Sequence, residues 1–206
     1  MTPEEILVLA NVISFIGNAL FTASALFKTK KRIIAFQTSC HLVNSVAAAI
    51  AIPVNPAAWS GLSQDATCFF KNIVLLFVDD SKKKLKLVVN IFFIIVALVL
   101  GIILTTTLGG AVWYGYLPIA GLFLYSIVAT YVFWKDNLSK NKVEVLLKSF
   151  LIVNGICQCI YGMLVPLYPN TIFNAITIVL SIYSIIRIAI TVKKQKNEKM
   201  KEDILE

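Results

Sequence analysis

The sequence predicts an all-α, polytopic membrane protein with seven transmembrane helices. Hydrophobic residues make up 58% of the chain and charged residues only 15%, far from the average of soluble domains. The chain also divides into apolar stretches, each about long enough to cross the ~30 Å hydrocarbon layer at about 1.5 Å per residue. These predicted spans are 6–27, 33–53, 57–78, 85–107, 112–134, 143–165 and 171–192.

The connections between the spans alternate between basic and uncharged. Lysine and arginine fill the first, third and fifth connections and the C-terminal tail, whereas residues 54–56, 105–111 and 167–170 carry no charge. Basic residues in short loops stay on the cytoplasmic side of a membrane. We therefore expect the N-terminus outside and the C-terminus inside.

The net charge of +8 has two interpretations. In a soluble protein it would raise nucleic acid as a partner. Here the basic residues are spread over short loops, where they set the topology and attract anionic lipid of the inner leaflet. We therefore expect membrane lipid, and no nucleic acid, among the partners.

The spans group as three helices, a linker helix and three more. The expected segments are a first three-helix bundle (1–80), the linker helix (81–110), a second three-helix bundle (111–192) and a charged cytoplasmic tail (193–206). The second helix of each bundle ends in the same pattern, namely Ile52-Pro53-Val54-Asn55-Pro56 and Val165-Pro166-Leu167-Tyr168-Pro169. This match favours an internal duplication, although proline ends helices at such turns in any case.

Polar residues recur at helical spacing in most spans, so each set lies on one helix face. Because polar groups avoid lipid, these faces are expected to point inward. In chain order the sets are Asn11, Ser14, Asn18 and Thr22; Gln37, His41 and Asn44; Gly61, Asp65, Cys68 and Asn72; a weaker Pro118, Gly121, Tyr125 and Ala129; Asn154, Gln158 and Tyr161; and Asn174, Thr177, Ser181 and Ser184. The span 85–107 is apolar or glycine from Ile91 to Leu104, so we expect it at the periphery.

Two three-helix bundles with a peripheral linker helix resemble the architecture of SWEET sugar transporters and their PQ-loop relatives. In sequence, the chain is similar to the YgjV family of bacterial inner-membrane proteins. The similarity lies in the short basic first loop, the helix over Gln37–Asn44, the small-residue outer turns and the final Ser184-Ile185-Ile186-Arg187. It covers nearly the whole chain and implies a multi-pass protein of the bacterial inner membrane with no settled substrate.

Asp65 is an acid that falls near the middle of a predicted span. A carboxylate there costs ~2.5–3.5 kcal/mol or more, so we expect either a protonated structural acid or a group that couples proton movement to transport. Midplane sites between repeats are common in transporters. The candidate substrate-binding residues, whose amides and hydroxyl suit a neutral polar ligand, are Asn18, Asn44, Gln64, Asp65, Asn154, Gln158, Asn174 and Ser181. The alternative for each amide is a structural hydrogen bond between helices.

His41 is the second candidate for proton coupling, because histidine titrates near neutral pH. The alternative is a structural histidine held by hydrogen bonds. Lys71 and Arg187 also fall inside predicted spans. We expect their long side chains to extend toward the inner surface rather than to pair with Asp65.

Enzymatic chemistry finds little support in the sequence. There is no metal-ligand spacing and no glycine-rich phosphate loop, and the neighbours Cys40 and His41 diverge by about 100° on a helix. We therefore expect no catalytic residue, cofactor or metal. The predicted function is a small transporter or facilitator for an unidentified small polar solute, as a monomer or a homo-oligomer. The alternative is a non-transporting membrane scaffold or accessory subunit.

Overall fold

The computed structural model describes residues 1–24, 30–79, 81–135 and 138–205, which form helices and no strand. The helices are α1 (Pro3–Ser24), α2 (Lys30–Ala51), α3 (Ala58–Phe77), α4 (Lys83–Thr107), α5 (Leu117–Trp134), α6 (Lys140–Leu164) and α7 (Tyr168–Leu205), with a 3-10 helix η1 (Trp113–Tyr116) before α5. The all-α fold class is confirmed, and each predicted span corresponds to a helix. The end of the predicted span 6–27 lies outside the described residues.

Six helical segments among the described residues are long and apolar enough to cross a membrane, and they belong to α1, α2, α4, η1 with α5, α6 and α7. These segments are compatible with a multi-pass membrane protein. α3 does not qualify, and Gln64, Asp65, Lys71 and Asn72 all fall within its 20 residues. Polar residues near mid-helix thus make the third predicted span the least apolar.

Local signals explain several of the helix ends. The Ser139 hydroxyl accepts a hydrogen bond from the Lys142 backbone N–H at 3.4 Å and so caps α6. Pro118 lies in the first turn of α5, where its missing N–H costs nothing. Pro53 and Pro166 follow the ends of α2 and α6, as the proline pattern predicts. α7, in contrast, continues through the predicted tail at Lys193 as far as Leu205.

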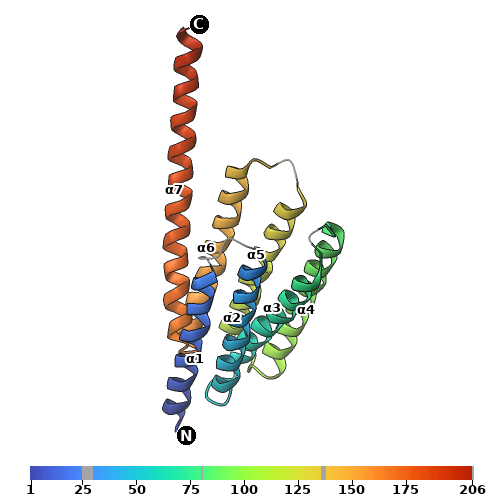
Figure 1. The fold of residues 1–206 in the computed structure, drawn as a ribbon. Helices are drawn as coiled ribbons and strands as arrows, with labels where there is room; N and C mark the ends of the chain where they lie inside the picture. Colours follow the sequence, from blue (N-terminus) through green and yellow to red (C-terminus); the bar gives the residue numbers. More distant parts are fainter. Residues whose placement is uncertain (25–29, 80, 136–137, 206) are drawn as a thin grey trace.

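The contacts between the described helices close a ring that leaves α4 outside, and Figure 1 shows α4 beside α3 at the edge of the bundle. Around the ring α1 packs on α2, α2 on α3, α3 on α5, α5 on α6, α6 on α7, and α7 on α1. α4 packs on α3, α5 and η1 among the described residues, and its exposed side chains include Ile91, Phe92, Ile95 and Val99. The expectation that the unstriped helix lies at the periphery is confirmed.

The first bundle (α1–α3) meets the second bundle (α5–α7) through two helix pairs, α1 with α7 and α3 with α5. If α1 is matched with α5, α2 with α6 and α3 with α7, one of these contacts corresponds to the other. The first two helices of each bundle also share one kind of contact, between a glycine and an asparagine. A Cβ on Gly17 of α1 would overlap Oδ1 of Asn44 in α2, and a Cβ on Gly121 of α5 would lie 2.7 Å from Oδ1 of Asn154 in α6. Both observations are those that a parallel duplication would produce.

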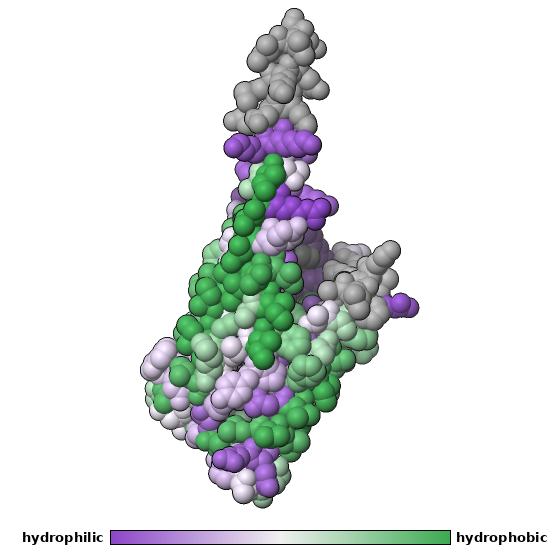
Figure 2. Space-filling model, turned by 90° about the vertical axis from the view of Figure 1, so that its left-hand side faces the viewer, coloured by the Kyte–Doolittle hydropathy of each residue, from purple (hydrophilic) through white to green (hydrophobic). Residues whose placement is uncertain are grey.

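The surface is apolar along the length of the bundle. Figure 2 shows a hydrophobic band with hydrophilic residues at its lower end and, above the band, around the projecting part of α7. Large apolar side chains are exposed on α7, including Val179 and Tyr183 at 65% and 63%. A soluble domain rarely exposes so large an apolar area, so the band is consistent with lipid as the surrounding solvent.

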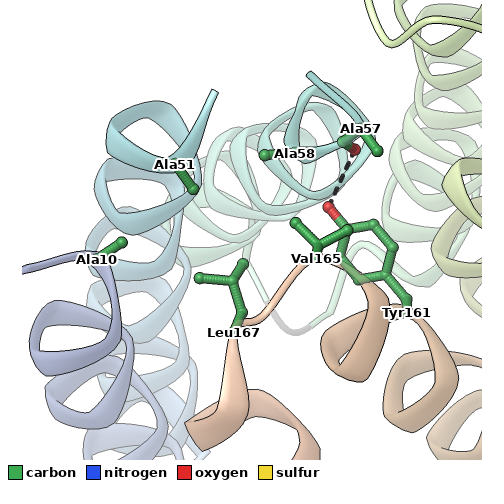
Figure 3. Close-up of a cluster of buried hydrophobic side chains, with 7 residues drawn as sticks. All are labelled: Ala10, Ala51, Ala57, Ala58, Tyr161, Val165 and Leu167. Carbon is green, nitrogen blue, oxygen red and sulfur yellow. Dashed lines mark hydrogen bonds between the residues drawn. The ribbon is translucent and has the colours of Figure 1, made fainter. Parts of the chain in front are cut away.

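A buried apolar cluster closes the end of the bundle at which the N-terminus lies (Figure 3). We call this end of the bundle the outer end, after the predicted topology. Its members are Ala10, Ala51, Ala57, Ala58, Tyr161, Val165 and Leu167. They come from α1, the α2–α3 region, the end of α6 and the α6–α7 connection, so both proline turns contribute to one contact between the bundles. Alanine at these positions lets the backbones approach closely, as small residues do in membrane helix pairs.

The alternation of loop charge gives a topology prediction. Reporter fusions placed after Asn55 and Gly110 are expected to report the outside, and fusions after Lys83 and Lys140 the inside, because lysine-rich loops are retained in the cytoplasm. Activity of a periplasmic reporter compared with a cytoplasmic one at each site measures this. A single reversed pair of fusions would require the spans to be redrawn.

A polar cavity between the two bundles as candidate functional site

A cavity of about 160 Å³ lies inside the ring of helices. One buried water needs a cavity volume of ~10–15 Å³ on the same scale, so the cavity has room for roughly ten waters or one small solute. Its polar lining side chains are Ser14, Asn18 and Thr22 from α1, Cys40, His41 and Asn44 from α2, Gln64 and Asp65 from α3, Asn154, Gln158 and Tyr161 from α6, and Asn170, Asn174 and Thr177 from α7. The cavity therefore lies between the two bundles.

The structure brings most of the sequence-predicted site residues together. His41 and seven of the substrate-binding candidates line this one cavity: Asn18, Asn44, Gln64, Asp65, Asn154, Gln158 and Asn174. Ser181 does not line it, although its side chain is buried at 1% exposure. It lies one helical turn beyond Thr177 on the same face of α7, past the end of the cavity. The sequence pattern identified its face correctly but not its depth.

The two titratable candidates form a pair. Nδ1 of His41 lies 2.8 Å from Oδ1 of Asp65, between residues 24 positions apart on α2 and α3. Their side chains are 21% and 23% exposed, so both remain in contact with the cavity. No other hydrogen bond involves Asp65 Oδ2 or His41 Nε2 among the described residues. One carboxylate oxygen and one ring nitrogen are therefore available to a solute.

Neither cation of the predicted spans pairs with Asp65 among the described residues, as expected. Lys71 lines a separate small pocket between α3, α4 and α5, together with Cys68 and Phe93. Arg187 is exposed on α7. Among the described residues, the lining of the main cavity contains no lysine or arginine. His41 is the basic side chain of this lining and Asp65 the acidic one.

A chain of amides crosses from α7 to α3 along the cavity. Asn174 Nδ2 donates to Asn170 Oδ1 at 2.9 Å, Asn170 Nδ2 donates to Gln158 Oε1 at 3.4 Å, and Gln158 Nε2 donates to Gln64 Oε1 at 3.0 Å. The last bond joins the second bundle to the first. Each amide donates toward α3, so the carbonyl groups of the chain all point back toward α7 and fix the direction of the network.

Several other polar residues of the lining form hydrogen bonds within their own helix. Asn18 Nδ2 donates to the Ser14 carbonyl at 2.8 Å, and the hydroxyls of Thr22 and Thr177 donate to Asn18 and Phe173 carbonyls at 3.1 and 2.9 Å. Oδ1 of Asn44 and of Asn154 is buried without a hydrogen-bond partner. Each faces the glycine of the neighbouring helix, where only weak Cα–H donors are available.

Further polar contacts join the bundles at the outer end of the cavity. The Tyr161 hydroxyl donates to the Ala57 carbonyl at 3.1 Å and accepts from the Gly61 N–H at 3.3 Å. Asn55 Nδ2 donates to the Leu164 carbonyl at 3.3 Å, and Asn11 Nδ2 donates to the Pro166 carbonyl at 2.9 Å. The outer end is thus closed by apolar packing and by these hydrogen bonds.

Sequence reasoning missed two residues of this site. Asn170 was assigned to the outer connection, but α7 begins at Tyr168, so Asn170 lies in its first turn and reaches Gln158. Tyr161 belonged to a predicted polar face without a role. The spacing of Asn170 and Asn174, one helical turn apart, is the signal that could have placed Asn170 on the same face.

Comparisons of this chain with protein-family models, with curated proteins and with solved structures find no match.

Proposed function

We propose that this protein is a small transporter or facilitator that moves a small polar solute through the cavity between its two bundles. The observation that carries the proposal is the cavity itself, which collects eight polar candidates from five helices. Polar side chains that served only to join helices would leave a dry, interdigitated interior. The alternative role, a scaffold or accessory subunit, has no specific need for such a space.

The movement that we propose is a rocking of the first bundle against the second, with the proline turns as flexible points. The conformation described above is then the one closed to the outside, supported by the Tyr161 and Asn55 bonds at the outer end. In the opposite state these bonds break and the bundles approach each other at the inner end. Parallel repeats around a midplane site are a common design for this cycle.

The proposal takes all seven α-helices as membrane spans, with the N-terminus outside, and places the chain in a bacterial inner membrane. The resemblance to the YgjV family and to the SWEET and PQ-loop architecture supports this placement. α3 spans despite its polar residues because they face the cavity or neighbouring helices rather than lipid, as intramembrane polar groups do. We propose that the function involves no catalysis, cofactor or nucleic acid.

Within this transporter, the His41–Asp65 pair is the proposed site of proton coupling. Asp65 Oδ1 and His41 Nδ1 are close enough to share a proton, and both side chains contact the cavity. A pair whose protonation changes with the occupancy of the cavity links the movement of solute to that of protons.

Ligand-dependent thermal stabilisation tests the proposal. The purified protein in detergent is heated with a panel of sugars, vitamins, nucleosides, amines and peptides, and hits are tested for uptake into proteoliposomes. A bound solute whose free concentration is 100 times its Kd stabilises the folded protein by about 2.7 kcal/mol. This gain is readily detected as a higher unfolding temperature. Failure of every solute to stabilise the protein or to enter the vesicles would leave the scaffold role.

A further inference from the structure

We infer that the cavity binds a small organic ammonium ion and exchanges it for one proton at the His41–Asp65 pair. This inference rests on the proposed transport function and names the class of solute. It starts from the count of hydrogen-bond donors and acceptors around the cavity. A bound solute must complement the groups that the protein leaves unpaired, because an unpaired group in a low-dielectric site weakens binding.

Most donors of the lining are already used by the protein. Asn18 and Asn174 donate to carbonyls of their own helices at 2.8 Å, and the hydroxyls of Thr22 and Thr177 do the same at 3.1 and 2.9 Å. What remains at these positions is oxygen: the amide carbonyl of each asparagine and the lone pairs of each hydroxyl. The lining therefore favours a solute that brings donors.

Charge points in the same direction. Asp65 supplies a carboxylate whose Oδ2 has no hydrogen-bond partner among the described residues, and the described lining holds no lysine or arginine. The one basic side chain that this lining offers to an anion is His41, whose Nδ1 is already bound to Asp65. An ammonium group would instead gain a charge-assisted hydrogen bond. The aromatic side chains of Phe21 and Phe173 also line the cavity, and aromatic rings attract cations.

A metal cation is a poorer match. Among the described residues no three His, Cys, Asp or Glu side chains gather closely enough to hold one. The cavity of about 160 Å³ also greatly exceeds the size of a bare ion. Gln64 uses its amide oxygen to accept from Gln158, and among the described residues the amide N–H groups of Gln64 and Asn154 donate no hydrogen bond. These N–H groups suit a hydroxyl or carbonyl at the far end of the solute.

The exchange step conserves charge at the site. In the empty cavity, protonated His41 and ionised Asp65 form a neutral ion pair. When the ammonium group binds Asp65, His41 releases its proton to water, and the ammonium–carboxylate pair is again neutral. One proton leaves for each cation bound, and the reverse reaction returns it. A buried site of constant net charge avoids the cost of an uncompensated ion in either state.

The titratable groups that face this pair are few. Cys40 of α2 and Tyr161 of α6 line the same cavity, and Cys68 and Lys71 lie further along α3 toward a separate pocket. Among the described residues, the lining residues from α1 and α7 carry no titratable group, and neither α4 nor α5 contributes to the lining. We assign the exchanged proton to His41, which bonds Asp65 directly.

A matched series of solutes tests the inference. The series is 4-aminobutan-1-ol, butane-1,4-diol and 4-hydroxybutanoate, which share a four-carbon chain and a hydroxyl and differ in charge. The wild type is expected to bind the amine at least tenfold more tightly than the diol or the anion, by thermal stabilisation and calorimetry. In weakly buffered solution, a pH indicator should record release of about one proton per amine bound.

Two variants and one control assign the effect to the pair. Asp65→Asn should lose at least tenfold in affinity for the amine and leave the diol unaffected. His41→Gln should bind the amine without releasing a proton. Glu144→Gln is the control, because it makes the same carboxylate-to-amide change at a residue that bonds Ser184 outside the cavity. It should behave as the wild type in both assays.

The outcomes separate this inference from the proposed function. Equal or tighter binding of the diol or the anion, no binding of the amine, or the same stabilisation by sodium or potassium chloride would overturn the ammonium assignment. Transport of a neutral solute from the wider panel would then leave the transport proposal standing. If the wild type transports no solute of either panel, both proposals fail together.

Discussion

Asp65→Asn is expected to abolish accumulation of solute against a gradient. The amide keeps the shape of the carboxylate and its oxygen can still accept from His41 Nδ1, whose present distance to Oδ1 is 2.8 Å. What it loses is the charge and the titration. Uphill uptake into proteoliposomes with an imposed pH gradient should fall to the level of empty vesicles. Counterflow, measured at a saturating solute concentration, should persist because it needs no net proton movement.

The fold of this variant can be verified by an unfolding temperature close to that of the wild type. Glu144 lies outside the cavity lining and accepts a hydrogen bond from Ser184 Oγ at 2.9 Å. Glu144→Gln should therefore retain uphill uptake. Normal accumulation by Asp65→Asn would make Asp65 a structural acid, and His41 would then be the remaining candidate for coupling.

The second large effect is expected at the contact between Tyr161 and the first turn of α3. Tyr161→Phe leaves the Ala57 carbonyl and the Gly61 N–H without the hydroxyl that bonds them at 3.1 and 3.3 Å. The Ala57 carbonyl still accepts from the Ser60 N–H and hydroxyl at 3.2 and 3.0 Å, so loss of the Tyr161 bonds is expected to cost about 0.5–1.5 kcal/mol. Gly61→Ala is expected to cost about 1–3 kcal/mol, because the new Cβ would lie 2.8 Å from the Tyr161 hydroxyl oxygen.

The double variant tests whether the loss of stability in Gly61→Ala is caused by the Tyr161 hydroxyl oxygen, the atom that Tyr161→Phe removes. With the hydroxyl removed, the nearest atoms to the new Cβ are ring carbons at 3.5 Å, an ordinary contact. Gly61→Ala should therefore cost little in the Tyr161→Phe background, and the double variant should unfold close to Tyr161→Phe alone. Unfolding in detergent measures all three. Tyr168→Phe, at an outer tyrosine that is 57% exposed, is the control and should change stability by less than about 0.5 kcal/mol. Strictly additive losses would contradict a direct contact.

The number and order of the helices could be predicted because two signals recur along the whole chain: the apolar length of each span and the alternating loop charge. The peripheral position of α4 followed from the absence of a polar face between Ile91 and Leu104. Helix ends were harder to predict. α7 runs to Leu205 without a break, because nothing in the lysine-rich segment after Val192 stops a helix.

The membership of the cavity could be predicted in large part, but its internal bonds could not. A helical period places Asn18, Asn154 and Asn174 on inward faces. To predict the bond from His41 to Asp65, one must also know the rotation and the depth of α2 relative to α3. The periodicity of polar residues gives neither quantity. For the same reason Ser181 lies on the expected face of α7 but beyond the cavity.

α7 has a geometric consequence for measurement. Its 38 residues form one continuous helix, which at 1.5 Å per residue is about 57 Å long. If the helix tilts as a rigid rod by about 10° around Pro169, its far end travels about 10 Å. A fluorophore near Leu205 would therefore magnify a small rotation at the outer turn into a displacement that single-molecule energy transfer can resolve. The same rod would carry any protein attached to the C-terminus through an equally wide arc.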